Sequence, residues 1–196
     1  MLSTRMKLAI LYSLKYSPEE AAAKYLVPYN LLLGYIKNND IINSLLTPDA
    51  KYNLIIELTL SGYSLSEISE ILSWKEFEDI VSNILKEFGY DVRRNIYIRK
   101  PKREIDIIGV KGSIALVIDC KNWRTKITES RVYEIVSKHI ERAEAAKVKL
   151  PFLRDKIIIP LIITLYPYRE IKVNSVFIIS IDKLKDFLLN IMAEVV

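Results

Sequence analysis

The spacing of apolar and polar residues changes once along the chain, near residue 73. Before that point, apolar residues recur at helical intervals between helix-start signals, so residues 1–72 are predicted to form about five short helices without a strand. After it, amphipathic helical segments alternate with short runs rich in Ile and Val. The pattern predicts two domains, a helical one over residues 1–72 and an α/β one over residues 73–196.

Helix starts in the first half are marked by hydroxyl residues. Ser17, Ser64 and Ser73 are each followed three positions later by a glutamate, the spacing of a capping box. Pro48 follows Thr47 and suits the first position of a further helix, where its missing N–H costs nothing. Each of these four signals predicts the first turn of a helix.

Two segments of the helical region resemble each other. Residues 8–25 and 55–72 both read as an apolar helix, a Tyr-Ser turn and a capped helix. The pattern is similar to the first two helices of a helix-turn-helix, and a third helix over residues 28–38 would then enter a DNA groove. A packing or dimerisation annex explains the same helices, because such helix pairs are common and this region is slightly acidic. The sequence leaves both interpretations open.

The second domain begins with a strongly amphipathic helix. Gly89 follows it as a left-handed C-cap, and three strands are expected over residues 92–98, 105–110 and 113–120. The short turn between the last two predicts an antiparallel meander. The apolar stripe of the helix consists of Trp74, Phe77, Val81, Ile84, Leu85 and Phe88.

The rest of the second domain predicts alternating helices and buried strands. A long helix is expected over residues 128–147, and a closing helix over residues 183–192. Between them, residues 156–165 and 175–181 are almost continuously aliphatic, which is typical of central strands covered on both faces. The inward face of the long helix is expected to present Val132, Val136, Ile140 and Ala143.

Composition narrows the compartment and the kind of metal site. No apolar run approaches the roughly 20 residues of a membrane span, and no cleavage site follows the first apolar residues, so we expect a cytoplasmic protein. The single cysteine, Cys120, excludes an internal disulfide. With His139 as the single histidine, a thiolate or imidazole zinc site is excluded as well. Any metal would be bound by oxygen.

The net charge of +5 is spread unevenly. Residues 1–72 carry −1, residues 73–128 carry +4, and residues 129–196 carry +2. The positive charge therefore surrounds the segment that contains the candidate chemistry, which favours a polyanion such as DNA as the partner.

A basic run without an acid lies between Asp91 and Glu104. Such a run is often a solvated edge strand, but this one leads directly to Asp106, so bound phosphates would lie near that carboxylate. The candidate DNA-binding residues are Arg93, Arg94, Arg99, Lys100, Lys102 and Arg103, together with Arg124 and Lys126 after the third strand.

Two carboxylates and a lysine are expected to share one face of the strand pair. Side chains two residues apart on a strand point the same way, so Asp106 can face Asp119, with Lys121 beside it. Two adjacent carboxylates resist ionising together unless a cation lies between them. Hard oxygen ligands suit Mg²⁺ or Mn²⁺, and Lys121 could hold an attacking water or steady charge on a phosphate.

The order of these residues resembles the catalytic core of the PD-(D/E)xK nucleases, especially Mrr-like restriction endonucleases and archaeal Holliday-junction resolvases. The resemblance covers roughly residues 74–126. Its residues are Phe77-Glu78, Gly89-Tyr90, Glu104-Ile105-Asp106 and Asp119-Cys120-Lys121-Asn122-Trp123.

The resemblance implies a restriction-endonuclease-like α/β core, with a central mixed sheet flanked by helices. It implies that Asp106 and Asp119 bind the metal and that Lys121 is the catalytic lysine. The carbonyl of Cys120 would be a further ligand, and Glu78 matches the helix glutamate that the family directs toward the metal. The family more often has glutamate at the position of Asp119.

We therefore expect a Mg²⁺- or Mn²⁺-dependent DNA endonuclease, restriction-type or structure-specific, with no membrane or organic cofactor as partner. One active site cuts one strand, so a homodimer is expected where both strands are cut. Two alternatives remain. The chain could be a catalytically inactive DNA-binding protein of the same fold, or a structural protein in which these residues form a buried ion-pair cluster.

Overall fold

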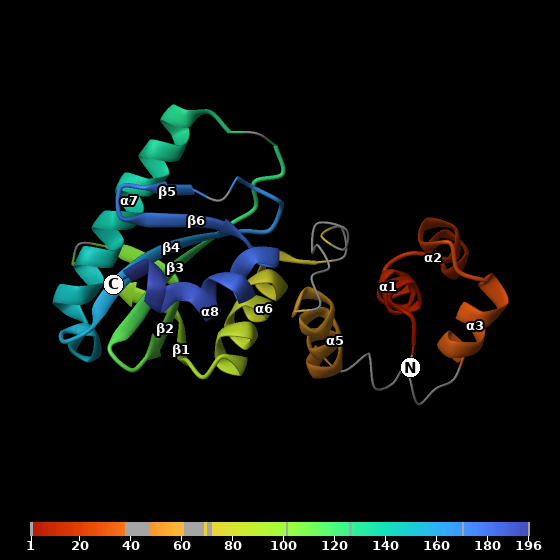
Figure 1. The fold of residues 1–196 in the computed structure, drawn as a ribbon. Coiled ribbons are helices and arrows are strands. Elements are labelled where there is room, and N and C mark those ends of the chain that lie inside the picture. Colours follow the sequence, from red (N-terminus) through yellow and green to blue (C-terminus); the bar gives the residue numbers. More distant parts are fainter. Residues whose placement is uncertain are drawn as a thin grey trace. The chain divides into compact units, whose positions relative to one another are not determined.

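The chain folds as two compact units, Met1–Ser73 and Trp74–Val196 (Figure 1). Within the described residues, the first unit contains helices, and the second contains a six-stranded mixed sheet flanked by helices. This architecture confirms the predicted α/β fold class with an added helical region. The computed structural model describes residues 2–37, 48–60, 69, 72–100, 102–125, 127–169 and 171–195.

The first unit begins with three helices whose starts follow the sequence signals. The helices are α1 (Thr4–Ser13), α2 (Pro18–Tyr25), α3 (Tyr29–Lys37) and, later in the chain, α5 (Pro48–Leu60). The capping box at Ser17 is confirmed, because its Oγ accepts a hydrogen bond from the Glu20 N–H at 3.2 Å and the Glu20 carboxylate accepts one from the Ser17 N–H. Pro48 is the first residue of α5, as predicted.

Each of these helices has at least one fully buried apolar side chain. Leu11, Ala21, Leu32 and Ile55, one from each helix, have no solvent exposure. Ser64 and most of the second helix pair lie outside the described residues. The helix-turn-helix and annex interpretations therefore both stay predictions.

The second unit contains the predicted helices and strands in the predicted order, with one additional strand. The short edge strand β5 was not predicted, because three residues between turns carry too little pattern. The elements are α6 (Trp74–Glu87), β1 (Asp91–Ile98), β2 (Arg103–Lys111), β3 (Ile114–Lys121), α7 (Glu129–Lys149), β4 (Ile157–Thr164), β5 (Ile171–Val173), β6 (Val176–Ser180) and α8 (Leu184–Val195), with 3₁₀ turns at Pro151–Leu153 and Ile181–Lys183.

The sheet has the strand order β1-β2-β3-β4-β6-β5. The pairs β1–β2 and β2–β3 are antiparallel, as the meander predicted, and β3–β4 and β4–β6 are parallel. Helix α7 makes the crossover from β3 to β4. Because β3 and β4 are parallel, with Lys121 paired to Thr164, their carboxyl ends lie side by side at one edge of the sheet.

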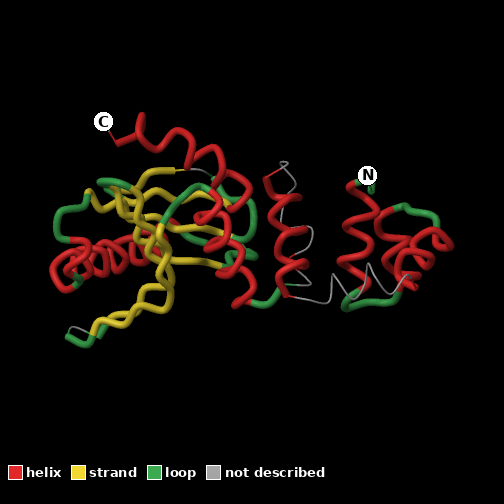
Figure 2. The backbone as a smooth tube through the Cα atoms, turned by 90° about the horizontal axis from the view of Figure 1, so that it is seen from below, coloured by secondary structure: helices red, strands yellow, loops and turns green. Residues whose placement is uncertain are grey.

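Helices cover both faces of the sheet (Figures 1 and 2). On β6, Ile178 packs in a cluster with α7, whereas the ring of the preceding residue, Phe177, contacts the ring of Phe187 on α8. On β2, Ile108 packs in a cluster with α7, and Gly109 lies against α6. Since neighbouring strand residues point to opposite faces, α7 covers one face and α6 and α8 cover the other.

Part of the strand pair β1–β2 extends beyond the rest of the sheet. Strand β1 pairs with β2 up to Ile98 and Arg103, whereas β2 pairs with β3 only from Ile107 onward. The outer half is therefore a two-stranded ribbon that extends past β3 (Figure 2). Asn95 has a positive φ of 50° in the middle of the ribbon, at the position that faces Asp106 in the register.

Three details of the predicted helices can be compared with the structure. Gly89 has a φ of 79°, which confirms the left-handed C-cap. Trp74 is 42% exposed, so its place in the buried stripe was wrong; it is the first residue of α6, where its ring contacts that of Phe77. On α7, Val132, Val136 and Ala143 are buried as predicted, whereas Ile140 is half-buried and its neighbour His139, 1% exposed, is buried instead.

Candidate active site

The register between β2 and β3 brings the two predicted aspartates together. Ile107 of β2 pairs with Ile118 of β3. Because the strands are antiparallel, Asp106, which precedes Ile107, lies opposite Asp119, which follows Ile118. Here β2 leaves β3, and the N–H of Cys120 loses the strand partner it would otherwise have. The Asp106 carboxylate replaces that partner, because its Oδ2 accepts a hydrogen bond from the Cys120 N–H at 2.8 Å.

Asp119 is buried, with 4% exposure, and holds a cation on each oxygen. Its Oδ2 lies 2.6 Å from Lys121 Nζ, and its Oδ1 accepts a hydrogen bond from Arg142 at 2.8 Å. The Lys121 ammonium also donates to the Cys120 carbonyl at 3.1 Å. The Lys121 ammonium thus contacts two of the groups expected to bind a metal, the Asp119 carboxylate and the Cys120 carbonyl.

Glu78 approaches the same place from helix α6. Its side chain is almost buried, and its Oε2 lies 3.5 Å from Arg94 on β1. The same guanidinium pairs with Asp79, the next residue on the helix. Arg94 therefore connects α6 to the ribbon beside the two aspartates, and the Glu78 charge is close enough to affect Asp106.

Burial dominates the electrostatics of Asp106. It raises the pKa of this carboxyl from 3.8 to about 6, against the lowering effect of the Cys120 N–H. The charges of Asp119 and Glu78 contribute to this rise in the pKa, and the charge of Lys121 opposes it. Near neutral pH the ionised Asp106 is therefore less stable than an ordinary aspartate, and a nearby cation would relieve this cost.

Asp106 differs from the other carboxylates of this cluster in the kind of group that it contacts. Glu78, Asp79 and Asp119 each pair with a cation, whereas Asp106 accepts a hydrogen bond from a backbone N–H. A cation bound near Asp106 would offset the cost of burying its charge. The carboxylates are Glu78, Asp79, Asp106 and Asp119, and the cations are Arg94, Lys121 and Arg142.

Arg142 was missed by the sequence analysis. It lies on α7, and its contact with Asp119 spans 23 residues of sequence. His139, three residues earlier on the same helix, is buried beside the cluster, with Nε2 3.0 Å from the Val117 carbonyl oxygen. Burial lowers the pKa of His139, which keeps the ring neutral. The signal in the sequence that could have pointed to Arg142 is its position next to the apolar stripe of α7, where a charged side chain can reach a buried partner.

The basic run is divided between internal contacts and solvent. Arg93 lies over the Phe152 ring at 3.8 Å, and Arg103 pairs with Glu141 of α7 at 2.8 Å. Arg94 belongs to the acidic cluster described above.

The cations near the tip of the ribbon face solvent. Arg99 and Lys100 are exposed, and Lys102 is exposed with its Nζ 6.0 Å from the Tyr97 ring centroid. Arg124 is exposed after the end of β3, and Lys126 lies outside the described residues.

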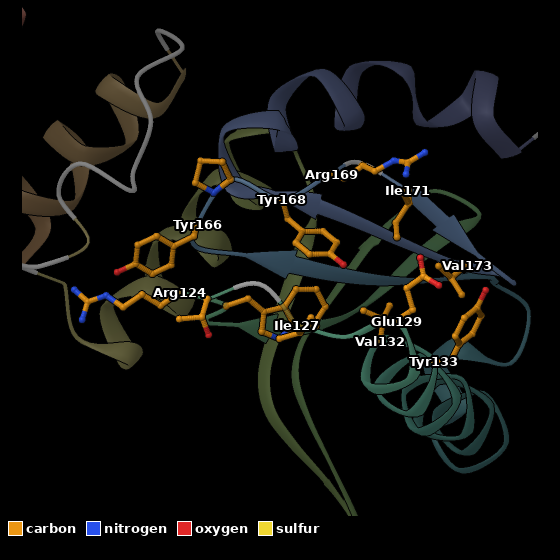
Figure 3. Close-up of a pocket in the computed structure, with 13 residues that line it drawn as sticks. Arg124, Ile127, Glu129, Val132, Tyr133, Tyr166, Tyr168, Arg169, Ile171 and Val173 are labelled. Carbon is orange, nitrogen blue, oxygen red and sulfur yellow. The ribbon is translucent and has the colours of Figure 1, made fainter.

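A pocket of about 780 Å³ opens beyond the carboxyl ends of β3 and β4 (Figure 3). Trp123 meets Tyr168 edge-to-face at 4.8 Å between ring centroids, and the Arg124 guanidinium lies 5.9 Å from the Tyr166 ring centroid. The lining is Trp123, Arg124, Thr125, Ile127, Glu129, Val132, Tyr133, Tyr166, Pro167, Tyr168, Arg169, Ile171 and Val173.

The donor set of the acidic cluster fits a hard divalent cation in part. Among the residues that the structure describes, no three His, Cys, Asp or Glu side chains converge closely enough to hold a metal by themselves. Mg²⁺, however, is usually held by one or two carboxylates and keeps sites for water and phosphate oxygens. Asp106, Asp119 and the Cys120 carbonyl meet that requirement.

No described helix is both long enough and apolar enough to cross a lipid bilayer.

Comparison with known proteins agrees with the geometry of the second unit. No curated protein matches the chain. The crystal structure of the protein of unknown function AF1548 matches with 17% identity and a TM-score of 0.34, over 56% of this chain and 51% of that one, so the match spans about half of that protein. The NERD family model, a nuclease-related domain, matches residues 73–163, from the start of α6 through most of β4. Residues 73–163 are therefore similar to this nuclease-related domain, which falls in the PD-(D/E)xK-like nuclease group.

Proposed function

We propose that this protein is a Mg²⁺- or Mn²⁺-dependent DNA endonuclease, of restriction or structure-specific type. The observation that carries the proposal is the convergence of Asp106, Asp119 and Lys121 where β2 leaves β3, with the lysine 2.6 Å from one carboxylate. The burial of Asp106 beside Asp119 and Glu78 supports the same conclusion, because a bound cation would offset the cost of its ionised form.

Asp106, Asp119 and the Cys120 carbonyl would hold the metal, and Glu78 would join them when its ion pair with Arg94 opens. A bound Mg²⁺ would polarise the phosphate and lower the pKa of a water molecule. Arg142 keeps the Asp119 carboxylate oriented through its Oδ1, which leaves Oδ2 directed at the lysine. If Asp119 and the Cys120 carbonyl bind the metal, the Lys121 ammonium would give up its contacts with these two groups. It could then steady the attacking water or the charge that develops on the phosphate.

DNA would reach this site along the exposed cations of the ribbon and of the loop after β3. Arg99, Lys100 and Lys102 are the exposed members of the basic run, and Arg124 follows the catalytic strand. Such groups bind phosphates without reading sequence. Lys126 is proposed to act with them.

Cutting both strands would require two sites, so we propose a homodimer on duplex substrates. Light scattering or sedimentation with and without DNA measures this directly, and a monomer that still cuts both strands of one duplex would contradict it.

The main experiment uses the purified chain with duplex, single-stranded, flapped and four-way-junction DNA, in Mg²⁺, Mn²⁺ or chelator. Wild type should cut at least one substrate only with metal. Lys121→Ala should bind DNA as wild type does and lose cleavage by about 100-fold or more. Lys111→Ala is the matched control, because that lysine also donates to a backbone carbonyl, that of Phe88, but lies at the other end of β2.

Two outcomes would replace this proposal. Binding without cleavage of any substrate would make the chain an inactive DNA-binding protein of the nuclease fold. Unfolding of Lys121→Ala, with Lys111→Ala intact by circular dichroism, would favour the structural ion-pair cluster.

A further inference from the structure

The pocket beyond β3 and β4 is connected to the candidate active site by a very short length of chain. Trp123 and Arg124 follow Lys121 by two and three residues, so their backbones lie within about 7 and 11 Å of it. On the other side, Tyr166 follows Thr164, which is the strand partner of Lys121. The Leu165 N–H donates to the Lys121 carbonyl at 3.0 Å, which ties the two pocket walls to the catalytic strand.

The lining combines flat aromatic rings with guanidinium groups. Tyr166 lies beside Arg124 at one end of the pocket, and Tyr168 and Ile127 lie nearer its middle (Figure 3). Arg169 supplies a second cation, and Glu129 is the carboxylate among the described residues of the lining. Rings stack on nucleobases of any sequence, and guanidinium groups bind the adjoining phosphates.

We propose that this pocket binds an unpaired nucleobase of the DNA strand whose phosphate occupies the active site. Tyr166 provides the ring on which the base stacks, and Arg124 and Arg169 contact the flanking phosphates. This inference rests on the proposed function, because it is the phosphodiester site at Lys121 that places a DNA strand beside the pocket. It makes DNA with a single-stranded segment, rather than a continuous duplex, the preferred substrate.

The preference follows from the shape of the pocket and the nature of duplex DNA. A paired base has both faces covered by its neighbours, so it must leave the helix before a protein ring can stack on it. Unstacking is least costly where the base is already unpaired, as in a flap, a gap or a single strand. A pocket lined by aromatic rings at the end of the sheet therefore favours such structures.

Trp123 is unsuitable as the main test residue because it also packs against the buried apolar cluster that α7 forms with β4 and β6. Tyr166 is half-exposed at the pocket, so its replacement leaves that cluster intact. The informative pair is Tyr166→Ala and Tyr166→Phe, since the second retains the ring. Tyr97→Ala, which removes an exposed tyrosine from the ribbon, is the control for general loss of aromatic surface.

Binding is measured on the full chain in chelator, by fluorescence anisotropy, with a labelled single strand, a flapped duplex, a continuous duplex of the same sequence and an RNA single strand. A 2-aminopurine placed in the flap reports stacking through quenching of its emission. Tyr166→Ala should weaken single-strand and flap binding by roughly tenfold to a hundredfold and remove the quenching. Duplex binding should not change, and Tyr166→Phe and Tyr97→Ala should keep both the flap preference and the quenching.

The outcomes separate this inference from the proposed function. If wild type cleaves DNA but Tyr166→Ala binds the flap and quenches 2-aminopurine as wild type does, the pocket assignment is wrong and the nuclease proposal stands. If no DNA is cut under any condition but the Tyr166 effects appear, the nuclease proposal fails and the base-binding pocket stands. Binding to the continuous duplex that equals or exceeds flap binding, or binding to RNA alone, overturns the inference.

Discussion

Asp106 is the residue at which folding stability and the proposed metal binding make opposite demands. Its carboxylate is largely withdrawn from water and is offset by one backbone N–H, beside two other acids. Folding therefore favours the protonated form, whereas metal binding needs the ionised form. Replacing Asp106 by asparagine, which has nearly the same shape but no charge, removes the cost of burying a charge and the metal ligand together, so the two effects can be measured separately.

Asp106→Asn should stabilise the metal-free protein at neutral pH while abolishing cleavage. The folded pKa of about 6 exceeds the ordinary 3.8, so the folded state binds a proton more tightly than the unfolded chain does. This contribution is complete below about pH 4 and is lost as the pH rises through about 6. Because the side chain keeps some solvent contact, we expect a gain of about 1–2 kcal/mol at pH 7.5.

The measurement is urea unfolding in chelator at several pH values, compared between wild type and Asp106→Asn. His139 acts with the opposite sign, because its lowered pKa makes the fold lose stability as the solution is acidified. The difference between the two proteins cancels that contribution. A difference that stays constant from pH 4 to 7.5 would show that Asp106 does not titrate in this range.

Arg142 acts on the site through Asp119 rather than through substrate. Arg142→Ala should remove one cation from a buried carboxylate and cost about 1–3 kcal/mol of folding stability. It should also lower kcat, because Asp119 loses the contact that orients it. Arg142→Lys should restore much of the stability, since it keeps the charge but not the planar fork.

Arg131→Ala is the comparison for Arg142→Ala. It removes an arginine from the same helix whose partner, Glu134, is exposed, so stability should change by less than about 0.5 kcal/mol. Equal losses in the two variants, measured by urea unfolding, would mean that the contact with Asp119 is not special.

At the scale of elements, the ribbon of β1 and β2 determines where the sheet ends and the site begins. Strand β2 separates from β3 at Asp106, and Asn95 on β1 adopts a left-handed conformation at the facing position. Beyond this point the ribbon residues Ile98 and Ile105 pack in the apolar cluster that the carboxyl-terminal half of α7 forms with β2 and β3. The change of direction frees the Asp106 side chain to bind the Cys120 N–H.

Asn95 can be tested with two substitutions that remove the same side chain. Asn95→Gly should leave stability within about 0.5 kcal/mol of wild type, because glycine adopts positive φ freely. Asn95→Ala should cost about 1 kcal/mol, because alanine is strained at a φ of 50°. Unfolding midpoints compare the two variants, and cleavage assays show whether the strained one displaces Asp106. Equal stability of both would show that the left-handed conformation is not required.

At the scale of the whole molecule, the positive charge lies mainly in the second unit, and the basic residues of the ribbon tip are exposed. Replacing Arg99 and Lys100 by glutamine should weaken DNA binding and reduce the slope of log K against log salt by roughly 2 for duplex DNA. Replacing Arg131 and Lys138 by glutamine is matched in residue type and charge, but both pair with Glu134 on α7. That control should keep the wild-type slope, and a similar drop in both variants would point to net charge rather than to the ribbon.

Most of the fold and the central residues of the site could be predicted from local pattern. The period of 3.6 located α6 and α7, and the period of 2 placed Asp106 and Asp119 face to face once the meander was assigned. The capping box at Ser17 and the left-handed Gly89 were predicted because their chemistry involves only residues a few positions apart.

Only the tertiary structure decided which charges are partners and where a cavity forms. The pairing of Arg142 with Asp119, of Arg94 with Glu78, and of Arg103 with Glu141 joins segments that local pattern cannot place next to each other. The pocket depends equally on β3 and β4 ending side by side. The sequence by itself determines each residue's preference for burial and backbone shape, which are local free energies. Ion pairs and cavities depend on distances between remote segments, and those distances exist only after the helices pack on the sheet.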